Sequence, residues 1–378
     1  MKRIFALYFS LFVSMAFGQK YASYASGPRV LTFADVEYGR IQLKVKSGTY
    51  TLTAYTPDST FTMDYGEDDV HPLYTFRNEL MLNKAGCDSI VISPSDTIEI
   101  RIRHGNNWTP IRPYLGKVII RPNRTYLETI VKVPVEPYIA GVVEAEGGMS
   151  AESEYHKAQS VLARTWLISN MGKHKEEGYH IKDDQSSQAF KGVPHGKHAS
   201  MISRAVEQTK DTIATHDGSP IIGFYHSNSG GYTVLPQDVW SKKLPYCRAV
   251  FDPFSKKETA YRWTKDIPLS EWNAYLKVPA DFDWSTYFRG LPEGRQTFYT
   301  IGDEIFKLET LRRHFKLRST YFTANAVGDT VHLEGYGFGH GVGMSQQGAM
   351  RMAMGGFHWK EILDFYFQKL SFEPVQNF

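Results

Sequence analysis

The chain has 378 residues with a formal net charge of +3 at pH 7, and hydrophobic residues make up 42% of it. This length predicts two domains, or one large domain with an appended module. So weak a positive charge, without a long run of Lys or Arg, excludes a dedicated nucleic-acid-binding protein, which would present a concentrated basic stripe.

The first residues have the pattern of an export signal, which we place at residues 1–18. Lys2 and Arg3 precede an apolar run from Ile4 to Phe17, and the small residues Ala16 and Gly18 mark a cleavage site. The run is shorter than the roughly 20 residues that span a bilayer, which favours cleavage over an uncleaved membrane anchor. With no later apolar span, we expect an exported protein of the periplasm, the cell envelope or the exterior.

Cys87 and Cys247 are the only cysteines of the chain. Two thiols exclude a disulfide framework and a four-thiolate metal site. A single bridge between them stays open, because the sequence does not give the distance between their Cα atoms.

Residues 19–112 are expected to form a small all-β module. The segments IQLKVKSGTYTLTAY from Ile41 and SIVISPSDTIEIRIR from Ser89 alternate apolar and polar residues. This period of two, interrupted by Ser, Gly, Pro and Asp, predicts strands joined by hairpins.

Residues 113–378 are expected to form a strand-rich second domain with a long helix packed on a sheet, so that the fold class is α+β. Strands are predicted at 116–121 and 125–133. The period then changes, because apolar residues from Ala158 to Trp166 fall on one stripe of a helix that we predict over 151–171.

Glu146 is the first candidate for chemistry. It lies between Ile139–Val143, which we predict to be a strand, and the long helix, and Gly147 and Gly148 follow it. A carboxyl at the end of a buried strand has a raised pKa, which suits a general acid, whereas an interaction with the helix N-terminus would lower that pKa. Glu144 would point the same way along a strand, as a second catalytic carboxylate or as an ion-pairing neighbour.

The segment YHSNSGGYT, from Tyr225 to Thr233, follows an apolar run at 220–225 that predicts a strand. Its hydroxyl groups and paired glycines form either an ordinary turn or a polar loop that hydrogen-bonds sugar hydroxyl or acetamido groups. A nucleophilic Ser227 or Ser229 with His340 as its base is a further alternative, although the motif GxSxG is absent.

The segment GYGFGHGVGMSQQGAM has a glycine at every second position from Gly335 to Gly343. In an extended segment this pattern leaves one face without Cβ atoms and puts His340 on the other. The bare face predicts close packing against another element, or a ligand such as a sugar ring over His340. A nucleotide-binding loop is excluded, because neither GxxxxGK[ST] nor GxGxxG fits.

These segments together resemble the stage II sporulation protein D and amidase enhancer family of bacterial cell-wall proteins. Four motifs occur in the family's order between about Tyr114 and Phe367: VPVEPYIAGVVEAEGGM, KAQSVLARTW, YHSNSGGYT, and GYGFGHGVGMSQQGAM followed by WKEILDFYF. Residues 19–112 lie outside the resemblance.

The resemblance implies a catalytic domain that cleaves peptidoglycan as a lytic transglycosylase, between N-acetylmuramic acid and N-acetylglucosamine. Glu146 matches the family's catalytic glutamate. It would protonate the leaving oxygen and then deprotonate the muramyl hydroxyl that closes the 1,6-anhydro ring, without a second carboxylate. The substrate-binding positions that we assign within these motifs are Gln159, Arg164, Tyr225, Ser227, Ser229, Gly230, His340, Gly341, Ser345 and Gln346.

This chain departs from the family pattern in two places. Many members have Met and Pro after the glutamate, whereas here Gly147, Gly148 and Met149 loosen the turn. The stretch KDDQSSQAFKG from Lys182 lacks the Cys and His that bind zinc in some members, so we expect no metal and no cofactor.

Two alternative functions stay open. One is a noncatalytic protein that binds cell-wall glycan and recruits or stimulates an amidase. The other is a two-carboxylate glycosidase that uses Glu144 or Glu334 beside Glu146 and leaves reducing ends. The expected partners are peptidoglycan glycan strands and, in the first alternative, a cell-wall amidase.

Overall fold

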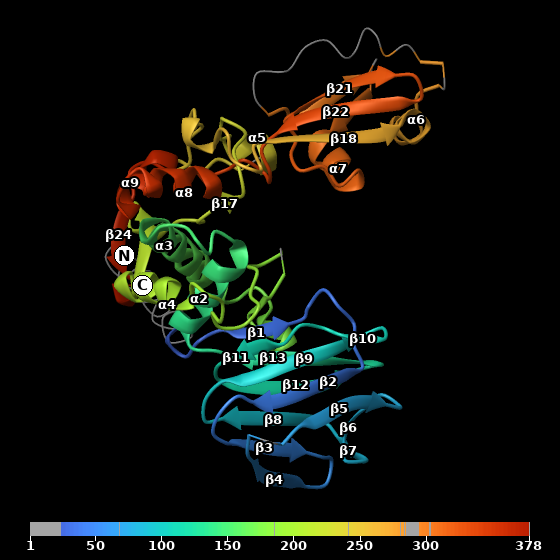
Figure 1. Cartoon of the computed structure of the whole chain (residues 1–378), viewed down its shortest axis with the longest axis vertical. Coiled ribbons are helices and arrows are strands. Elements are labelled where there is room, and N and C mark those ends of the chain that lie inside the picture. The colour runs from blue at the N-terminus through green and yellow to red at the C-terminus, as the bar shows by residue number, and fades with distance from the viewer. Residues whose placement is uncertain are drawn as a thin grey trace, which may run out of the picture. The chain divides into compact units, whose positions relative to one another are not determined.

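A computed structural model describes residues 24–67, 69–184, 186–240, 242–279, 281–282, 284, 295–301 and 304–377. The export signal predicted for residues 1–18 lies outside the described residues. The chain divides into two compact units (Figure 1), and each is described by itself. Unit 1 takes the described residues up to 150, 159–213 and those from 372 on, and unit 2 takes 151–158 and 214–371.

The fold class is α+β, as the sequence predicts. Helices account for 26% of the described residues and strands for 36%, and the strands lie in several separate sheets.

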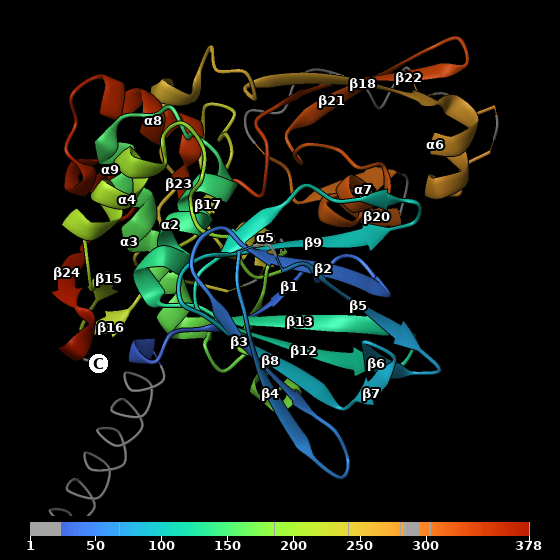
Figure 2. The ribbon, with the colours of Figure 1, turned by 60° about the horizontal axis from the view of Figure 1, so that its bottom comes forward.

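Unit 1 contains two large sheets, whose strands are seen in Figure 2. The order of the first is β14 (Ile181–Lys182), β1 (Arg29–Thr32), β13 (Tyr126–Lys132), β12 (Lys117–Asn123), β8 (Ser89–Pro94), β3 (Tyr50–Tyr55) and β4 (Thr60–Tyr65). The order of the second is β10 (Asn107–Trp108), β9 (Ile98–His104), β2 (Arg40–Val45), β5 (His71–Phe76), β6 (Glu79–Leu82) and β7 (Ala85–Cys87), with β11 (Arg112–Tyr114) also paired with β9.

Alternate side chains of these strands are buried in one hydrophobic core. Along β9, for example, Ile98, Ile100 and Ile102 are completely buried while the residues between them are half-buried. The strands predicted before residue 108 and at 116–121 and 125–133 are therefore confirmed. Strands on both sides of residue 113 belong to the same sheets, since β11 pairs with β9 and β12 with β8. The domain division at residue 113 stays a prediction.

Among the described residues up to 213, four helices of unit 1 follow β13 in the chain. They are α2 (Val135–Glu146), α3 (Ser153–Asn170), the short 3₁₀ helix η1 (Lys175–Glu177) and α4 (Ala199–Gln208). The predicted helix over 151–171 is α3 and is confirmed. Its residues 153–158 belong to unit 2 and the rest to unit 1.

The strand predicted over 139–143 is wrong, because this segment is the middle of α2. The residues from Tyr138 to Val143 are all buried, so an apolar run without a helical period marks a buried helix here. Gly141 allows close packing of this helix. A Cβ there would lie 2.1 Å from the carbonyl oxygen of Gly192 and 2.6 Å from the ring of Phe190. This packing fixes the position of the helix whose last residue is Glu146.

Unit 2 contains an antiparallel sheet of β18 (Arg262–Pro268), β22 (Thr330–Tyr336) and β21 (Phe322–Val327), and a hairpin of β19 (Phe298–Ile301) and β20 (Glu304–Lys307). The helices α6 (Leu269–Leu276) and α7 (Leu308–His314) share a hydrophobic core with the sheet, to which Trp263, Trp272 and Leu311 contribute.

The remaining elements of unit 2 hold the glycine-rich and serine-rich motifs. Its strands include β16 (Ser219–Pro220), β17 (Tyr225–His226) and β23 (Met344–Ser345), and its helices are α5 (Gln237–Trp240), η2 (Pro253–Ser255), α8 (Gln346–Met354) and α9 (Trp359–Tyr366). The chain enters unit 2 along β15 (Thr212–His216) and leaves it along β24 (Ser371–Pro374), before η4 (Val375–Asn377). The strand predicted over 220–225 is present only at its two ends, in β16 and β17.

Cys87 and Cys247 are both buried free thiols, so no disulfide joins them. Within the described ranges, no helix has the length and apolar character needed to cross a bilayer.

Candidate functional site

Glu146 is the last residue of α2, and its side chain is half-buried. Its Oε1 accepts the backbone N–H of Ala189 at 3.1 Å. Gly147 and Gly148 follow with φ angles of 107° and 76°, in the left-handed region that favours glycine. A Cβ at Gly147 would meet no described atom within 4 Å, so the turn after Glu146 has open space beside it.

A buried phenol lies near the carboxylate of Glu146. Tyr138 is completely buried in α2, and its O–H donates to Oε1 of Gln188 at 3.1 Å. Burial, together with the negative charge of Glu146, raises the pKa of Tyr138 well above its usual value. Gln188 in turn precedes Ala189, the donor to Glu146. The surroundings of Glu146 therefore include a neutral phenol and a positioned backbone amide.

Glu144 does not point the same way as Glu146, so that expectation is wrong. The segment is helical, and residues two apart in a helix lie about 200° apart around its axis. Oε1 of Glu144 accepts the N–H of Gly196 at 3.1 Å and that of His195 at 3.3 Å. Glu144 thus positions the loop at 195–196 rather than forming a carboxylate pair with Glu146.

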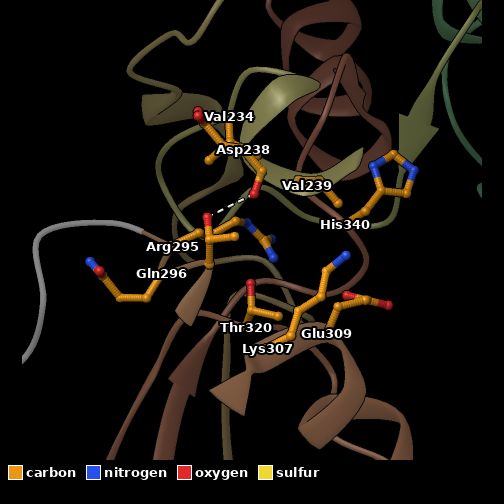
Figure 3. A pocket seen from close by; sticks show the side chains of 10 residues that line it. Val234, Asp238, Val239, Arg295, Gln296, Lys307, Glu309, Thr320 and His340 are labelled. Carbon is orange, nitrogen blue, oxygen red and sulfur yellow. Dashed lines mark hydrogen bonds between the residues drawn. The ribbon is translucent and has the colours of Figure 1, made fainter. Parts of the chain in front are cut away.

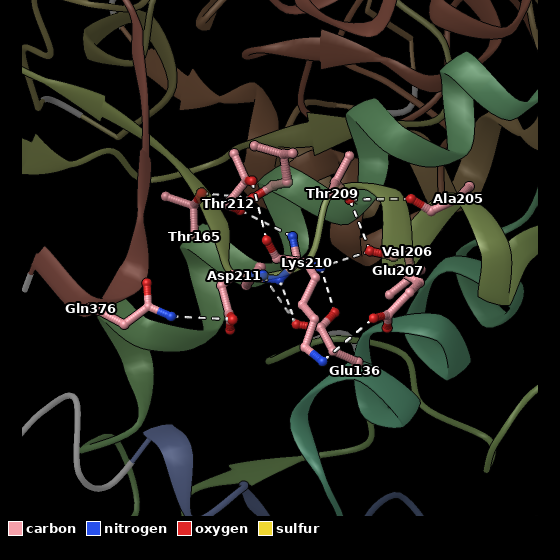
Figure 4. A network of polar contacts seen from close by, with 12 residues as sticks. Glu136, Thr165, Ala205, Val206, Glu207, Thr209, Lys210, Asp211, Thr212 and Gln376 are labelled. Carbon is pink, nitrogen blue, oxygen red and sulfur yellow. Dashed lines mark hydrogen bonds and ion pairs between the residues drawn. The ribbon is translucent and has the colours of Figure 1, made fainter.

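Arg164 holds the opposite end of α2, at Glu136, which Figure 4 shows in a network of polar contacts with Thr212 and Asp211 nearby. Its completely buried guanidinium donates to both carboxylate oxygens of Glu136, from Nε at 3.1 Å and from Nη2 at 2.5 Å. Nη1 donates to the carbonyl of Thr212 at 3.0 Å. Glu136 precedes Glu146 by ten residues of helix, roughly 15 Å along the axis. Arg164 therefore binds a structural carboxylate at a distance from the candidate acid.

Gln159 is completely buried in α3, and neither atom of its amide has a hydrogen-bond partner among the described residues. Such a buried group is unusual, because an unsatisfied amide costs about 1–3 kcal/mol. Unlike the guanidinium of Arg164, the amide of Gln159 forms no hydrogen bond within the described residues.

The third and fourth motifs meet in unit 2. Tyr225 and His226 pair in parallel with Met344 and Ser345, and the backbone of Asn228 pairs with that of Phe338. The N–H of Ser229 donates to Oγ of Ser345 at 3.2 Å, and the amide of Asn228 donates to Oε1 of Gln347 at 2.8 Å. Segments more than 100 residues apart thus form one polar loop cluster.

The glycines from Gly337 to Gly343 do not form the extended segment that was predicted. Gly337, Gly339, Gly341 and Gly343 all have φ between 72° and 101°. Every second residue is left-handed, which only glycine adopts without strain, so the alternation reflects a coiled backbone instead of a bare strand face.

Arg295 packs into this glycine segment. Its Nη1 donates to the carbonyl of Gly339 at 2.7 Å, and Nη2 donates to the carbonyl of Asn228 at 3.3 Å. A Cβ at Gly341 would lie 2.3 Å from Nε of Arg295, and one at Gly337 would lie 2.7 Å from its Nη2. Nothing in the sequence pattern indicated this guanidinium, which links the two motifs.

His340 lies among aromatic rings and is used by the protein itself. Its Nδ1 accepts the N–H of Val342 at 3.0 Å, and its ring centroid lies 4.8 Å from that of Trp240. Burial and the nearby Arg295 lower its pKa to about 3, so the ring is neutral at pH 7. Figure 3 shows it on the wall of a small pocket with Asp238 and Arg295.

Ser229 belongs to a buried network around Asp252 that the sequence did not reveal. Its Oγ donates to Asp252 Oδ2 at 2.8 Å, and Tyr366 donates to the same oxygen at 3.2 Å. Burial raises the pKa of Asp252. Ser255 completes the network through the Oγ atoms at 2.8 Å. Asp252 belongs to none of the four motifs. The motif residue that leads to it is Ser229, its hydrogen-bond partner.

The predicted site residues fall into two groups. Unit 1 holds Glu146, Gln159 and Arg164, and unit 2 holds Tyr225, Ser227, Ser229, Gly230, His340, Gly341, Ser345 and Gln346. The second group is one cluster, in which Ser229 and Ser345 are completely buried and Gly230 and Gly341 have positive φ. Across the described residues, no three His, Cys, Asp or Glu side chains are grouped as metal ligands would be.

Comparison with known proteins gives matches over most of the chain. The family model "SpoIID: Stage II sporulation protein" matches residues 123–216. The stage II sporulation protein D of Bacillus subtilis is 31% identical over 270 residues, 68% of this chain and 79% of that protein. The amidase enhancer of B. subtilis is 27% identical over 290 residues, 61% of this chain but only 39% of that longer protein.

A further relative extends the similarity toward the N-terminus. An uncharacterised protein of Brachyspira hyodysenteriae is 25% identical over 347 residues, 89% of this chain and 93% of that protein. This share is larger than residues 113–378 alone, so the similarity reaches into the β-rich region before residue 113.

Proposed function

This chain belongs to the stage II sporulation protein D family, and from that membership we propose that it is an exported peptidoglycan lytic transglycosylase with Glu146 as its single acid and base. The observation that supports the proposal is the position of Glu146, half-buried at the end of α2 beside a glycine turn with open space. A glycan strand needs such space to bring its glycosidic oxygen to a carboxyl group.

The proposed reaction requires one carboxyl group in two roles. Protonated Glu146 donates its proton to the glycosidic oxygen as the bond to C1 of N-acetylmuramic acid breaks. The resulting carboxylate then takes the proton of the C6 hydroxyl as that oxygen attacks C1, which closes the 1,6-anhydro ring and regenerates the acid. Because no water attacks, no second carboxylate is required, in agreement with the hydrogen bonds that engage Glu144 elsewhere.

The test is to identify the glycan ends that the protein produces. Purified glycan, both intact and stripped of its peptides, is incubated with the protein and analysed by mass spectrometry. Wild type is expected to release anhydromuramyl ends, and Glu146→Gln to lower their rate of release by about 10²–10⁴-fold. Glu144→Gln is the matched control, since its carboxylate binds a loop and should leave activity nearly unchanged. Anhydro ends that persist with Glu146→Gln, or reducing ends with wild type, contradict the proposal.

A second candidate function is a noncatalytic glycan-binding protein that stimulates a cell-wall amidase. The similarity to a protein named amidase enhancer favours it. It predicts that the protein sediments with purified cell wall without releasing fragments, that Glu146→Gln binds equally well, and that both raise the rate of an added amidase.

A further inference from the structure

A row of aromatic side chains runs along unit 2 beside the polar loop cluster. Tyr232 and Phe251 begin it, with 47% and 49% of their surfaces exposed. Their ring centroids lie 5.1 Å apart, and their backbones pair as a β-bridge. Backbone pairing holds the two residues side by side, and their exposed, contacting rings form one aromatic surface.

The row continues past Gly231. A Cβ at Gly231 would lie 3.8 Å from the hydroxyl of Tyr261, which places Tyr261 directly beside the residue before Tyr232. Tyr261 packs on Tyr336 with ring centroids 5.3 Å apart, and Tyr336 packs on Tyr321 at the same distance. Burial and the neighbouring phenols raise the pKa of Tyr261. The last three rings are half-buried.

Cations accompany the row at two points. Nζ of Lys256 lies 4.7 Å from the ring centroid of Phe251, and the guanidinium of Arg262 lies 5.8 Å from that of Tyr336. Arg262 also pairs with Glu334 at 2.8 Å. Lys256 takes part in no ion pair among the described residues, so its charge is available to a ligand.

We propose that this aromatic row of unit 2, made of Phe251, Tyr232, Tyr261, Tyr336 and Tyr321 together with Lys256, binds the glycan strand of peptidoglycan. The inference rests on the proposed function, and it adds a noncatalytic binding surface that keeps the enzyme on its polymer. The faces of sugar rings carry C–H bonds with a partial positive charge, which contact the negative faces of aromatic rings. Lys256 would pair with the carboxylates of the strand's stem peptides.

The composition of the surface favours a glycan over a protein partner. Among the large apolar side chains exposed near the two motifs, Tyr232, Trp240, Phe251 and Phe338 are aromatic and Met354 is not. Protein interfaces add aliphatic side chains to such anchors, whereas an extended sugar strand needs ring faces and hydroxyl groups in a line. An acidic polymer also suits the unpaired cation at Lys256 better than a neutral one.

The test measures sedimentation with insoluble peptidoglycan in a Glu146→Gln background, which prevents digestion of the ligand. Tyr232→Ala and Phe251→Ala are each expected to weaken binding roughly two- to tenfold, as expected for loss of one aromatic contact. Phe251→Leu keeps apolar bulk but removes the ring, and it should weaken binding as much as Phe251→Ala. Lys256→Gln should reduce the sensitivity of binding to salt.

Phe76→Ala is the matched control. Phe76 is 53% exposed in β5 and has the guanidinium of Arg77 at 5.2 Å, so it reproduces the exposure and the cation of Phe251 in unit 1. It should bind peptidoglycan like the parent. Unchanged binding by Tyr232→Ala and Phe251→Ala, with thermal unfolding like that of the parent, overturns the inference. Equal weakening by Phe76→Ala also overturns it. Binding is read without cleavage, so absent anhydro ends would contradict only the proposed reaction.

Discussion

Helix α2 has a glutamate in its first turn and another at its end, and the two carboxylates have opposite surroundings. Glu136 is held on both oxygens by the completely buried guanidinium of Arg164. Glu146 accepts a backbone N–H and lies half-buried beside a glycine turn with open space. One residue type in one helix thus forms a closed ion pair at one end and an accessible carboxyl group at the other.

The polar side chains of the loop cluster in unit 2 resemble Glu136, because they too form hydrogen bonds within the protein. Ser229 donates to Asp252, Ser345 caps α8 by accepting the N–H of Gly348, and His340 accepts the N–H of Val342. Polar side chains that are bonded in this way stabilise the loops that hold them, because breaking each bond leaves a buried group unsatisfied. Matching a family motif therefore does not by itself separate residues that hold the site from residues that act on substrate.

Arg164→Met is expected to have the largest effect on stability. It removes one partner of a buried ion pair and leaves the carboxylate of Glu136, which is 15% exposed, without its cation. We expect the free energy of unfolding to fall by about 3–5 kcal/mol, measured by urea denaturation.

The matched control for this prediction is Arg262→Met. Arg262 forms a single ion pair with Glu334, and both side chains are at least half exposed. Because this pair is exposed to solvent, its loss should leave the free energy of unfolding close to that of wild type. If Arg164→Met is as stable as wild type but binds glycan poorly, then Arg164 belongs to the substrate site. Its ion pair with Glu136 would then not have the stabilising role given to it here.

The sequence predicted strands better than it predicted the candidate site. Alternation along 41–55 and 89–103 identified strands correctly, because those strands bury one face. The segment 139–143 misled because α2 is buried on all sides there and so shows no helical period. Glu146 was identified from its place before the long helix and from its match to the family's glutamate, but its position at a helix end instead of a strand end could not be derived from periodicity.

The glycine segment shows a second limit of sequence patterns. Alternating glycines in a strand and alternating left-handed glycines in a coil have the same spacing, so only the backbone angles distinguish them. The partners Arg295 and Asp252 lie outside every motif, and contacts that join residues so distant in the chain leave no periodic signal.

The substitutions Gly341→Ala and Gly147→Ala compare the thermal stability of a glycine with close neighbours and a glycine with open space beside it. Both positions have positive φ, 85° and 107°, so alanine is strained at each, by about 1–3 kcal/mol. At Gly341 the new Cβ would also lie 2.3 Å from Arg295, whose guanidinium is fixed by Gly339 and cannot simply move away, which adds about 1–3 kcal/mol. At Gly147 no described atom lies within 4 Å. Thermal unfolding should therefore rank Gly341→Ala well below Gly147→Ala, and equal melting temperatures would contradict the role given to Arg295.

The smallest effect is expected when the pH is lowered. It tests whether the ring of His340 is buried within the loop cluster. Burial lowers the folded-state pKa of His340 to about 3, below its ordinary value of 6.5, and lowers that of His226 as well. Between pH 3 and pH 6.5 the unfolded chain binds more protons than the folded chain. The stability that comes from burying these rings in their neutral form is therefore complete above pH 6.5 and is lost as the pH falls toward 3. The raised pKa of Asp252 acts in the opposite sense, since its contribution is present at low pH and lost as the pH rises. His340→Gln should flatten the fall in melting temperature by a few degrees over this window, measured by thermal unfolding at a series of pH values. An unaltered slope with His340→Gln would mean that His340 is solvated and open to a ligand.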